Sequence, residues 1–108
     1  MSVPADIDVA GLRALLAGDP ITLLDVRNDP EVAMGVIAGA RHIPLPELVA
    51  REHELPRDRP LVVYCQSGAR SARAAGFLAN AGFGGVHNLR GGILAWLREG
   101  EVLSPSTQ

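Results

Sequence analysis

The residue with the clearest covalent chemistry is Cys65, the single cysteine in a chain of 108 residues. It follows a short apolar run at residues 61–64 and precedes a helical pattern that begins near Ser71. The loop in between consists of Gln66, Ser67, Gly68, Ala69 and Arg70. Ligands of open α/β sheets bind beyond the carboxyl ends of the strands, so this cysteine occupies the position of a site residue.

The loop has the composition of an anion-binding turn. Its small residues let successive backbone N–H groups turn inward, and Gly68 can adopt a positive φ without strain. The following helix start adds a partial positive charge. Both effects favour a thiolate, so we expect the pKa of Cys65 to be lowered. The alternative is that Cys65 is a small apolar core residue, because free cysteines are often buried.

The charged residues exclude several functions. All ten cationic residues are arginine, which removes phosphate-binding, Schiff-base and general-base lysines. The net charge of -2 gives no basis for binding nucleic acid or an anionic membrane. One cysteine permits neither a disulfide within the chain nor a Cys-x-x-Cys pair. The three histidines lack metal-ligand spacing, so no metal site is expected.

Strand-like and helix-like segments alternate around this loop. Apolar runs predict strands at residues 21–26 and 61–64, with shorter ones near 42–43 and 86–89. Helical spacing predicts helices at 9–17, 70–81 and 92–99, where Trp96 faces the core. This alternation predicts a parallel α/β sheet with helices on both faces. We expect a single domain over residues 1–103 and a loose tail at 104–108.

Residues 1–6 lack the basic and apolar regions of a secretory signal. The longest apolar runs are far shorter than a membrane-spanning helix. The expected location is the cytoplasm, where a free thiol persists.

Three ordered blocks of the chain resemble the rhodanese-like sulfurtransferases. Residues 65–71, Cys-Gln-Ser-Gly-Ala-Arg-Ser, resemble the family's active-site loop. Residues 25–44, with Asp25, Arg27 and Glu31, resemble its first block, and residues 89–96 resemble its C-terminal block. Val36 stands where the family usually has histidine, which leaves open what replaces that side chain's polar contacts.

The resemblance implies a three-layer fold with a central parallel sheet of about five strands. It implies that Cys65 takes a sulfane sulfur from thiosulfate or a persulfide and becomes a persulfide itself. Cyanide or a thiol then removes the outer sulfur, and either the donor or the acceptor can be another protein. Backbone amides of residues 66–70 are expected to bind the anion, with Gly91 and Gly92 bordering the pocket. No metal or organic cofactor is required.

Two other functions stay open. Tyrosine-phosphatase-type loops, as in some phosphatases and arsenate reductases, follow a Cys-x5-Arg pattern, whereas four residues separate Cys65 from Arg70 here. The shorter loop favours a smaller anion. The second alternative is a binding or regulatory module of the same fold without turnover.

The roles of three charged residues are also alternatives at this stage. Asp25 and Arg27 either touch substrate or hold loops together, with Arg27 pairing to Glu31. Arg70 either supplies charge to the substrate or braces the loop. Because the other loop side chains are neutral, we expect weak affinity for thiosulfate and a preference for a persulfide or protein donor.

Overall fold

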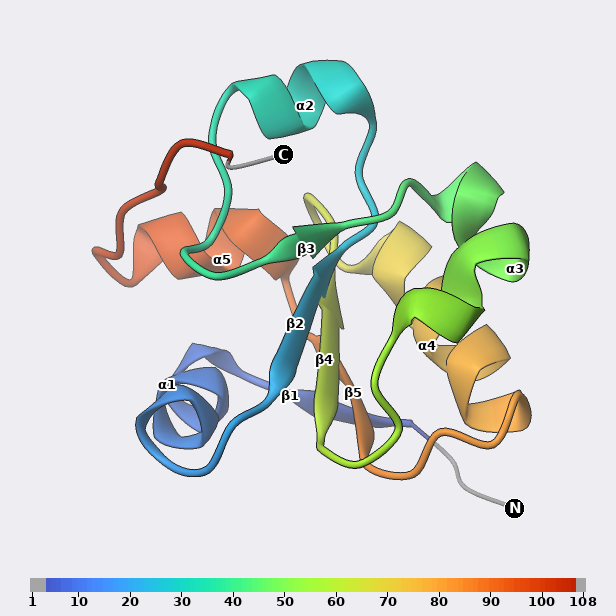
Figure 1. The fold of residues 1–108 in the computed structure, drawn as a ribbon. Helices are drawn as coiled ribbons and strands as arrows, with labels where there is room; N and C mark the ends of the chain where they lie inside the picture. Colours follow the sequence, from blue (N-terminus) through green and yellow to red (C-terminus); the bar gives the residue numbers. More distant parts are fainter. Residues whose placement is uncertain (1–3, 107–108) are drawn as a thin grey trace.

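The computed structural model describes residues 4–106 and contains one five-stranded sheet. All pairings are parallel, in the order β1-β5-β4-β2-β3 (Figure 1). The strands are β1 (Ala5–Ile7), β2 (Thr22–Asp25), β3 (Arg41–His42), β4 (Leu61–Tyr64) and β5 (Val86–Leu89). The predicted parallel α/β sheet of about five strands is therefore confirmed.

Helices cover both faces of this sheet. α1 (Val9–Ala17) and α5 (Gly92–Arg98) lie on one side, while α3 (Leu48–Arg51) and α4 (Ala69–Asn80) lie on the other (Figure 1). α2 (Asp29–Ala33) sits beyond the end of β2. Two 3-10 turns, Leu45–Glu47 and Glu52–Glu54, flank α3. The layers are those expected of the three-layer fold.

β4 shows why continuous apolar runs became strands. All four of its residues are buried. Leu61 and Val63 contribute to the core under α3 and α4, while Val62 and Tyr64 contribute to the core under α1 and α5. Side chains alternate between the two faces of a strand, so a strand covered on both faces needs apolar residues at every position.

Locally encoded helices match their predicted positions. α1 occupies the predicted range, and its N-cap Asp8 accepts a 2.8 Å hydrogen bond from the Gly11 N–H group. α4 begins and ends one residue before the predicted helix. Trp96 is only 6% exposed, which confirms its predicted place in the core.

Three elements were missed by the sequence prediction: β1, α2 and α3. β1 is a mostly exposed strand at the sheet edge, and its three residues lack a continuous apolar run. Only its pairing with β5 makes it a strand. α2 is short, and its start is held by a 3.0 Å hydrogen bond from the Asn28 N–H group to Glu31.

The predicted loose tail is wrong at its first residue. Ser104 forms an antiparallel bridge with Val36, with two N–H to carbonyl hydrogen bonds of 2.7 Å. The Trp96 indole also donates to the Val102 carbonyl at 3.0 Å, so the chain after α5 packs back on the domain. Residues 107 and 108 lie outside the described range. None of the helices in residues 4–106 has the length and apolar character needed to span a bilayer.

Candidate active site

Cys65 lies at the carboxyl end of β4, and its sulfur faces the start of α4. The chain turns at Gly68, whose φ of +105° is open to glycine but strained for other residues. This turn directs the Gly68 N–H group at Sγ of Cys65, at 3.1 Å. The Ser71 N–H group, in the first turn of α4, lies 3.4 Å from the same sulfur. Of the predicted inward-facing amides, that of Gly68 donates to the sulfur, and the Ser71 amide, which was not among those predicted, is a second donor.

Ser71 also contributes its side chain, which the sequence prediction did not assign to the site. Its Oγ atom lies 3.4 Å from Sγ of Cys65 and 2.6 Å from Oδ1 of Asn88, so its one proton can be donated to either atom. Asn88 is on β5 and only 5% exposed. An amide side chain inside a predicted strand was the available signal for Asn88, because buried amides need partners.

These contacts set the ionisation of the thiol. Burial raises the pKa of Cys65, but hydrogen bonds from the Ser71 hydroxyl and from the N–H groups of Ser71, Gly68 and Ser67 lower it. The hydrogen bonds outweigh burial, so the pKa lies below its ordinary value. A thiolate is the nucleophilic form of cysteine. The site therefore contains a buried thiol that ionises more readily than a free one.

The N-terminus of α5 binds the backbone carbonyls at the start of the Cys65 loop. The Ile93 N–H group donates to the Cys65 carbonyl at 2.9 Å, and the Leu94 N–H group donates to the Gln66 carbonyl at 3.1 Å. A Cβ atom on Gly92 would lie 2.4 Å from the Gln66 carbonyl oxygen and 2.6 Å from that of Cys65. Only glycine permits this approach, so Gly92 places α5 directly against the loop.

Arg70 braces the loop against α2. Its two terminal nitrogens donate to the two carboxylate oxygens of Glu31 at 2.7 and 2.8 Å. The side-chain hydrogen bond from Arg70 is the main cause that lowers the pKa of Glu31 to about 2. The guanidinium is thus already paired with a carboxylate, in the geometry that a bound anion would otherwise use.

Asp25 and Arg27 form a buried ion pair. Nη2 of Arg27 lies 2.8 Å from Oδ2 of Asp25 and also donates to the Gly35 carbonyl at 2.7 Å. The pairing expected between Arg27 and the Glu31 side chain is wrong. Arg27 reaches only the Glu31 backbone oxygen, at 3.4 Å, since the Glu31 carboxylate binds Arg70. The side chains of Asp25 and Arg27 are 0% and 5% exposed, a burial that fits the predicted loop-holding role.

The remaining predicted loop residues lie at the surface. Gln66, Ser67 and Ala69 are exposed, in contrast to Cys65, which is 1% exposed. Within residues 4–106 there is no group of three or more His, Cys, Asp or Glu side chains that could hold a metal ion.

Sequence comparison identifies the family behind this geometry. Residues 8–99 match the Rhodanese-like domain family. The chain belongs to the rhodanese-like family. A protein of Allochromatium vinosum named sulfurtransferase is 44% identical over 96 residues, which are 88% of this chain and 90% of that protein. The crystal structure of a rhodanese-related protein from Thermoplasma volcanium is 34% identical, with a TM-score of 0.86 over 94% of this chain and 99% of that one.

The rhodanese-like unit also occurs inside larger proteins. A tRNA uridine(34) hydroxylase of Nitrobacter winogradskyi is 35% identical over 99 residues, which are 86% of this chain but only 39% of that protein. A rhodanese-like domain that spans most of the chain, together with a relative named sulfurtransferase, supports a role in sulfur transfer.

Proposed function

We propose that this rhodanese-like domain is a sulfurtransferase that carries one sulfane sulfur atom as a persulfide of Cys65. The observation that supports this most strongly is the set of donors around Sγ. Two N–H groups, from Gly68 and Ser71, and the Ser71 hydroxyl lie 3.1 to 3.4 Å from the sulfur. Such donors stabilise negative charge, first on the thiolate and then on a bound sulfur anion.

The reaction has two displacements and needs no external proton. The Cys65 thiolate attacks the outer sulfur of thiosulfate, the new S–S bond forms, and sulfite leaves with the electron pair of the broken bond. Cyanide then attacks the outer sulfur of the persulfide, thiocyanate leaves, and the thiolate is restored. A persulfide donor or a thiolate acceptor reacts by the same two displacements, which together are covalent ping-pong catalysis.

Burial of Cys65 fits a small transferred group. An S–S bond of about 2.05 Å moves the outer sulfur from the buried Sγ toward the exposed part of the loop. There the backbone N–H groups of the loop can stabilise its charge. We assign this role to Gln66, Ser67, Gly68, Ala69 and Arg70. Asp25 and Arg27 hold the chain around α2, through the Glu31 and Gly35 carbonyls, and do not touch substrate.

The Glu31–Arg70 pair bears on the choice of donor. Thiosulfate is a dianion that the Arg70 guanidinium could attract. That guanidinium is already paired with the Glu31 carboxylate. We therefore propose that thiosulfate binds weakly and that a persulfide, free or on a protein, is the better donor. Saturation with thiosulfate at micromolar concentration would contradict this preference. The same pairing disfavours a phosphatase, whose loop arginine must be available to phosphate.

The acceptor must come from outside the chain, because no second cysteine is present to attack the Cys65 persulfide. A free catalytic thiol persists in a reducing compartment, which makes the cytoplasm the proposed location.

Mass spectrometry of the intact protein tests the proposal. Incubation with thiosulfate or a small persulfide should add the mass of one sulfur atom to the wild type and nothing to Cys65→Ser. Cyanide should then remove the sulfur and release thiocyanate. Absence of an adduct with every sulfane donor would favour a binding module. Cys65-dependent turnover of an aryl phosphate would favour a phosphatase.

A further inference from the structure

Ser71 and Asn88 form a buried polar pair beside the sulfur. Oγ of Ser71 lies 2.6 Å from Oδ1 of Asn88 and 3.4 Å from Sγ of Cys65. Both side chains are shielded from bulk water, because Ser71 is 0% and Asn88 only 5% exposed. A hydroxyl group has a single proton, and a buried donor without an acceptor is unfavourable. The Ser71 proton therefore has two acceptors within reach and can use only one of them well at a time.

The partners of the Asn88 amide nitrogen show which end of the amide faces Ser71. Nδ2 donates to the Asp6 carboxylate at 3.3 Å and to the Gly68 carbonyl at 3.4 Å. These oxygens only accept, so the nitrogen belongs at that end of the amide and the oxygen faces Ser71. An amide oxygen also only accepts. In the 2.6 Å hydrogen bond the Ser71 hydroxyl is therefore the donor.

The charge on the sulfur determines which acceptor is better. A thiol sulfur, or the inner sulfur of a persulfide, is uncharged and accepts weakly, so the proton is better placed on Asn88. A thiolate is a charged acceptor, and hydrogen bonds to charged groups are about twice as strong as neutral ones. Rotation of the Ser71 hydroxyl moves its proton between the two acceptors while every heavy atom stays in place.

Charged groups act on this cluster from two elements. On β1, the Asp6 carboxylate accepts from the Asn88 amide nitrogen. At the start of α4, Arg70 interacts electrostatically with Cys65, and a guanidinium has no acceptor to offer. Within residues 4–106, neither of these charged groups forms a hydrogen bond with the Ser71 hydroxyl.

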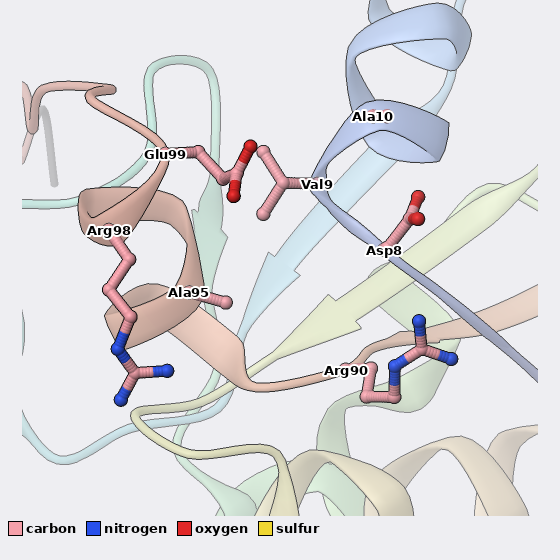
Figure 2. A pocket seen from close by; sticks show the side chains of 7 residues that line it. All are labelled: Asp8, Val9, Ala10, Arg90, Ala95, Arg98 and Glu99. Carbon is pink, nitrogen blue, oxygen red and sulfur yellow. The ribbon is translucent and has the colours of Figure 1, made fainter.

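The groove between the start of α1 and α5 is separate from this cluster (Figure 2). Asn88 contacts Ser71 of α4, whereas α1 and α5 lie on the other face of the sheet. Arg90 is among the residues that line the groove, but Ser71 and Asn88 are not. The two acceptors for the Ser71 proton are therefore Asn88 and the sulfur.

We propose that Asn88 is a positioning residue for sulfur transfer, which holds the Ser71 proton while the Cys65 sulfur is uncharged and releases it when that sulfur becomes a thiolate. The inference rests on the proposed function for its place in the reaction. When an acceptor thiolate attacks the outer sulfur, the S–S bond breaks and its electron pair stays on Sγ. The hydroxyl then turns from Asn88 to the new thiolate. Formation of the next persulfide reverses this turn, and no proton leaves Ser71.

The pH profile of alkylation by iodoacetamide tests this competition. Asn88→Leu keeps the branched shape of the side chain and removes the competing acceptor, so the Ser71 hydroxyl is free to donate to the thiolate. The midpoint for alkylation of Cys65 should fall by about 0.5–1 pH unit, the equivalent of one hydrogen bond. Thr22→Val is the matched control, since Thr22 is also buried but starts β2, at the opposite end of the sheet. Its midpoint should equal that of the wild type.

A double variant separates competition from support of the turn. Asn88 also donates to the Gly68 carbonyl, and loss of that contact alone would loosen the turn and raise the pKa of Cys65. Asn88→Leu should therefore be compared in the wild type and in Ser71→Ala, where no hydroxyl is present to compete for. The midpoint change should be at least about 0.5 pH unit more negative when Ser71 is present. Equal changes in the two backgrounds would overturn the proposal.

The wild type supplies a measurement that does not depend on the folding of any Asn88 variant. The side-chain amide NMR signals of Asn88 should shift with the same midpoint as alkylation of Cys65, because the amide oxygen loses a hydrogen bond when the thiolate forms. Most of this shift should be absent in Ser71→Ala. Signals that do not follow the midpoint would refute the role of Asn88. Both experiments need only the thiol, so failure to form a persulfide would refute sulfur transfer alone.

Discussion

At the scale of single residues, the reactivity of Cys65 depends on a balance between burial and hydrogen bonding. Burial opposes ionisation of the thiol, and donors from Ser71, Gly68 and Ser67 favour it. Ser71 contributes twice, through its N–H group and its hydroxyl. Of these donors, only the Ser71 hydroxyl can be removed without changing the backbone. Substitution of Ser71 can therefore change the pKa of Cys65 while the backbone donors stay in place.

Ser71→Ala should raise the pKa of Cys65, because the thiolate loses a donor while its burial stays. Alkylation by iodoacetamide, followed across pH, should reach its plateau at a higher pH than in the wild type. Near neutral pH the alkylation rate should fall about three- to tenfold, the equivalent of one hydrogen bond to a charged group. Ser71→Thr keeps the hydroxyl and should retain most of the rate. An unshifted pH profile in Ser71→Ala would remove Ser71 from this role.

The sequence predicts which residues belong to the site better than it predicts which residues contact one another. Cys65 and its small loop residues are adjacent in the chain, so their local turn was predictable. Asn88 is 17 residues from Ser71, and Glu31 is 39 residues from Arg70. These pairs exist because the sheet brings the ends of β2, β4 and β5 together. A sequence pattern names such residues but not their partners.

At the scale of elements, α5 and the Cys65 loop act as one unit. The start of α5 supplies two N–H groups to the carbonyls of Cys65 and Gln66. Gly92, with a φ of +59°, allows the two backbones to meet. The glycine pair at the start of α5 therefore maintains the shape of the loop as well as starting a helix.

Gly92→Ala should lower the free energy of unfolding by at least about 2 kcal/mol and abolish persulfide formation, since its Cβ atom would collide with two carbonyl oxygens. Gly76→Ala is the matched control. Gly76 is inside α4, and a Cβ atom there would meet nothing within 4 Å. That variant should gain about 0.5–1 kcal/mol from helix propensity and keep full activity. Urea unfolding and the sulfur adduct mass measure both effects. Wild-type stability in Gly92→Ala would show that the loop can move aside.

Local signals explain which elements were predictable. α1 has both a capping aspartate and a glycine stop in its sequence, and β4 is apolar throughout. β1 has neither feature, because an exposed edge strand of three residues is defined by its neighbour. The same applies to the bridge between Val36 and Ser104, which is made by backbone atoms alone. Val36 thus replaces the usual histidine at a position held by main-chain hydrogen bonds.

At the scale of the whole molecule, the Glu31–Arg70 pair ties α2 to the start of α4 across the end of the sheet. The pKa of Glu31 is lowered from 4.5 to about 2 in the folded protein. Its ionised form therefore adds stability above pH 4.5, and this stability is lost as the pH falls toward 2. Solvent reaches both side chains, which are 31% and 24% exposed, so screening keeps the contribution at about 1 kcal/mol.

Glu31→Gln should consequently unfold at lower urea concentration than the wild type at pH 7, and the difference should shrink between pH 4.5 and 2. Release of Arg70 should also lower KM for thiosulfate by about two- to fivefold. Asp58→Asn removes an exposed carboxylate from its neighbour Arg59 and should leave both quantities unchanged. A constant stability gap across the acid range would contradict the assigned ionisation.

The strand order also determines when the molecule can be completed during synthesis. β1 is the first strand to be made, and β5, its only neighbour, is the last. The contact between them encloses most of the chain, and contacts so distant in sequence slow folding more than they weaken stability. The hydrogen bonds from residues 93 and 94 to the Cys65 loop come later still. On the ribosome the thiol is therefore made before its loop has its final cover, and the loop can take its final shape only once residues 93 and 94 have been added.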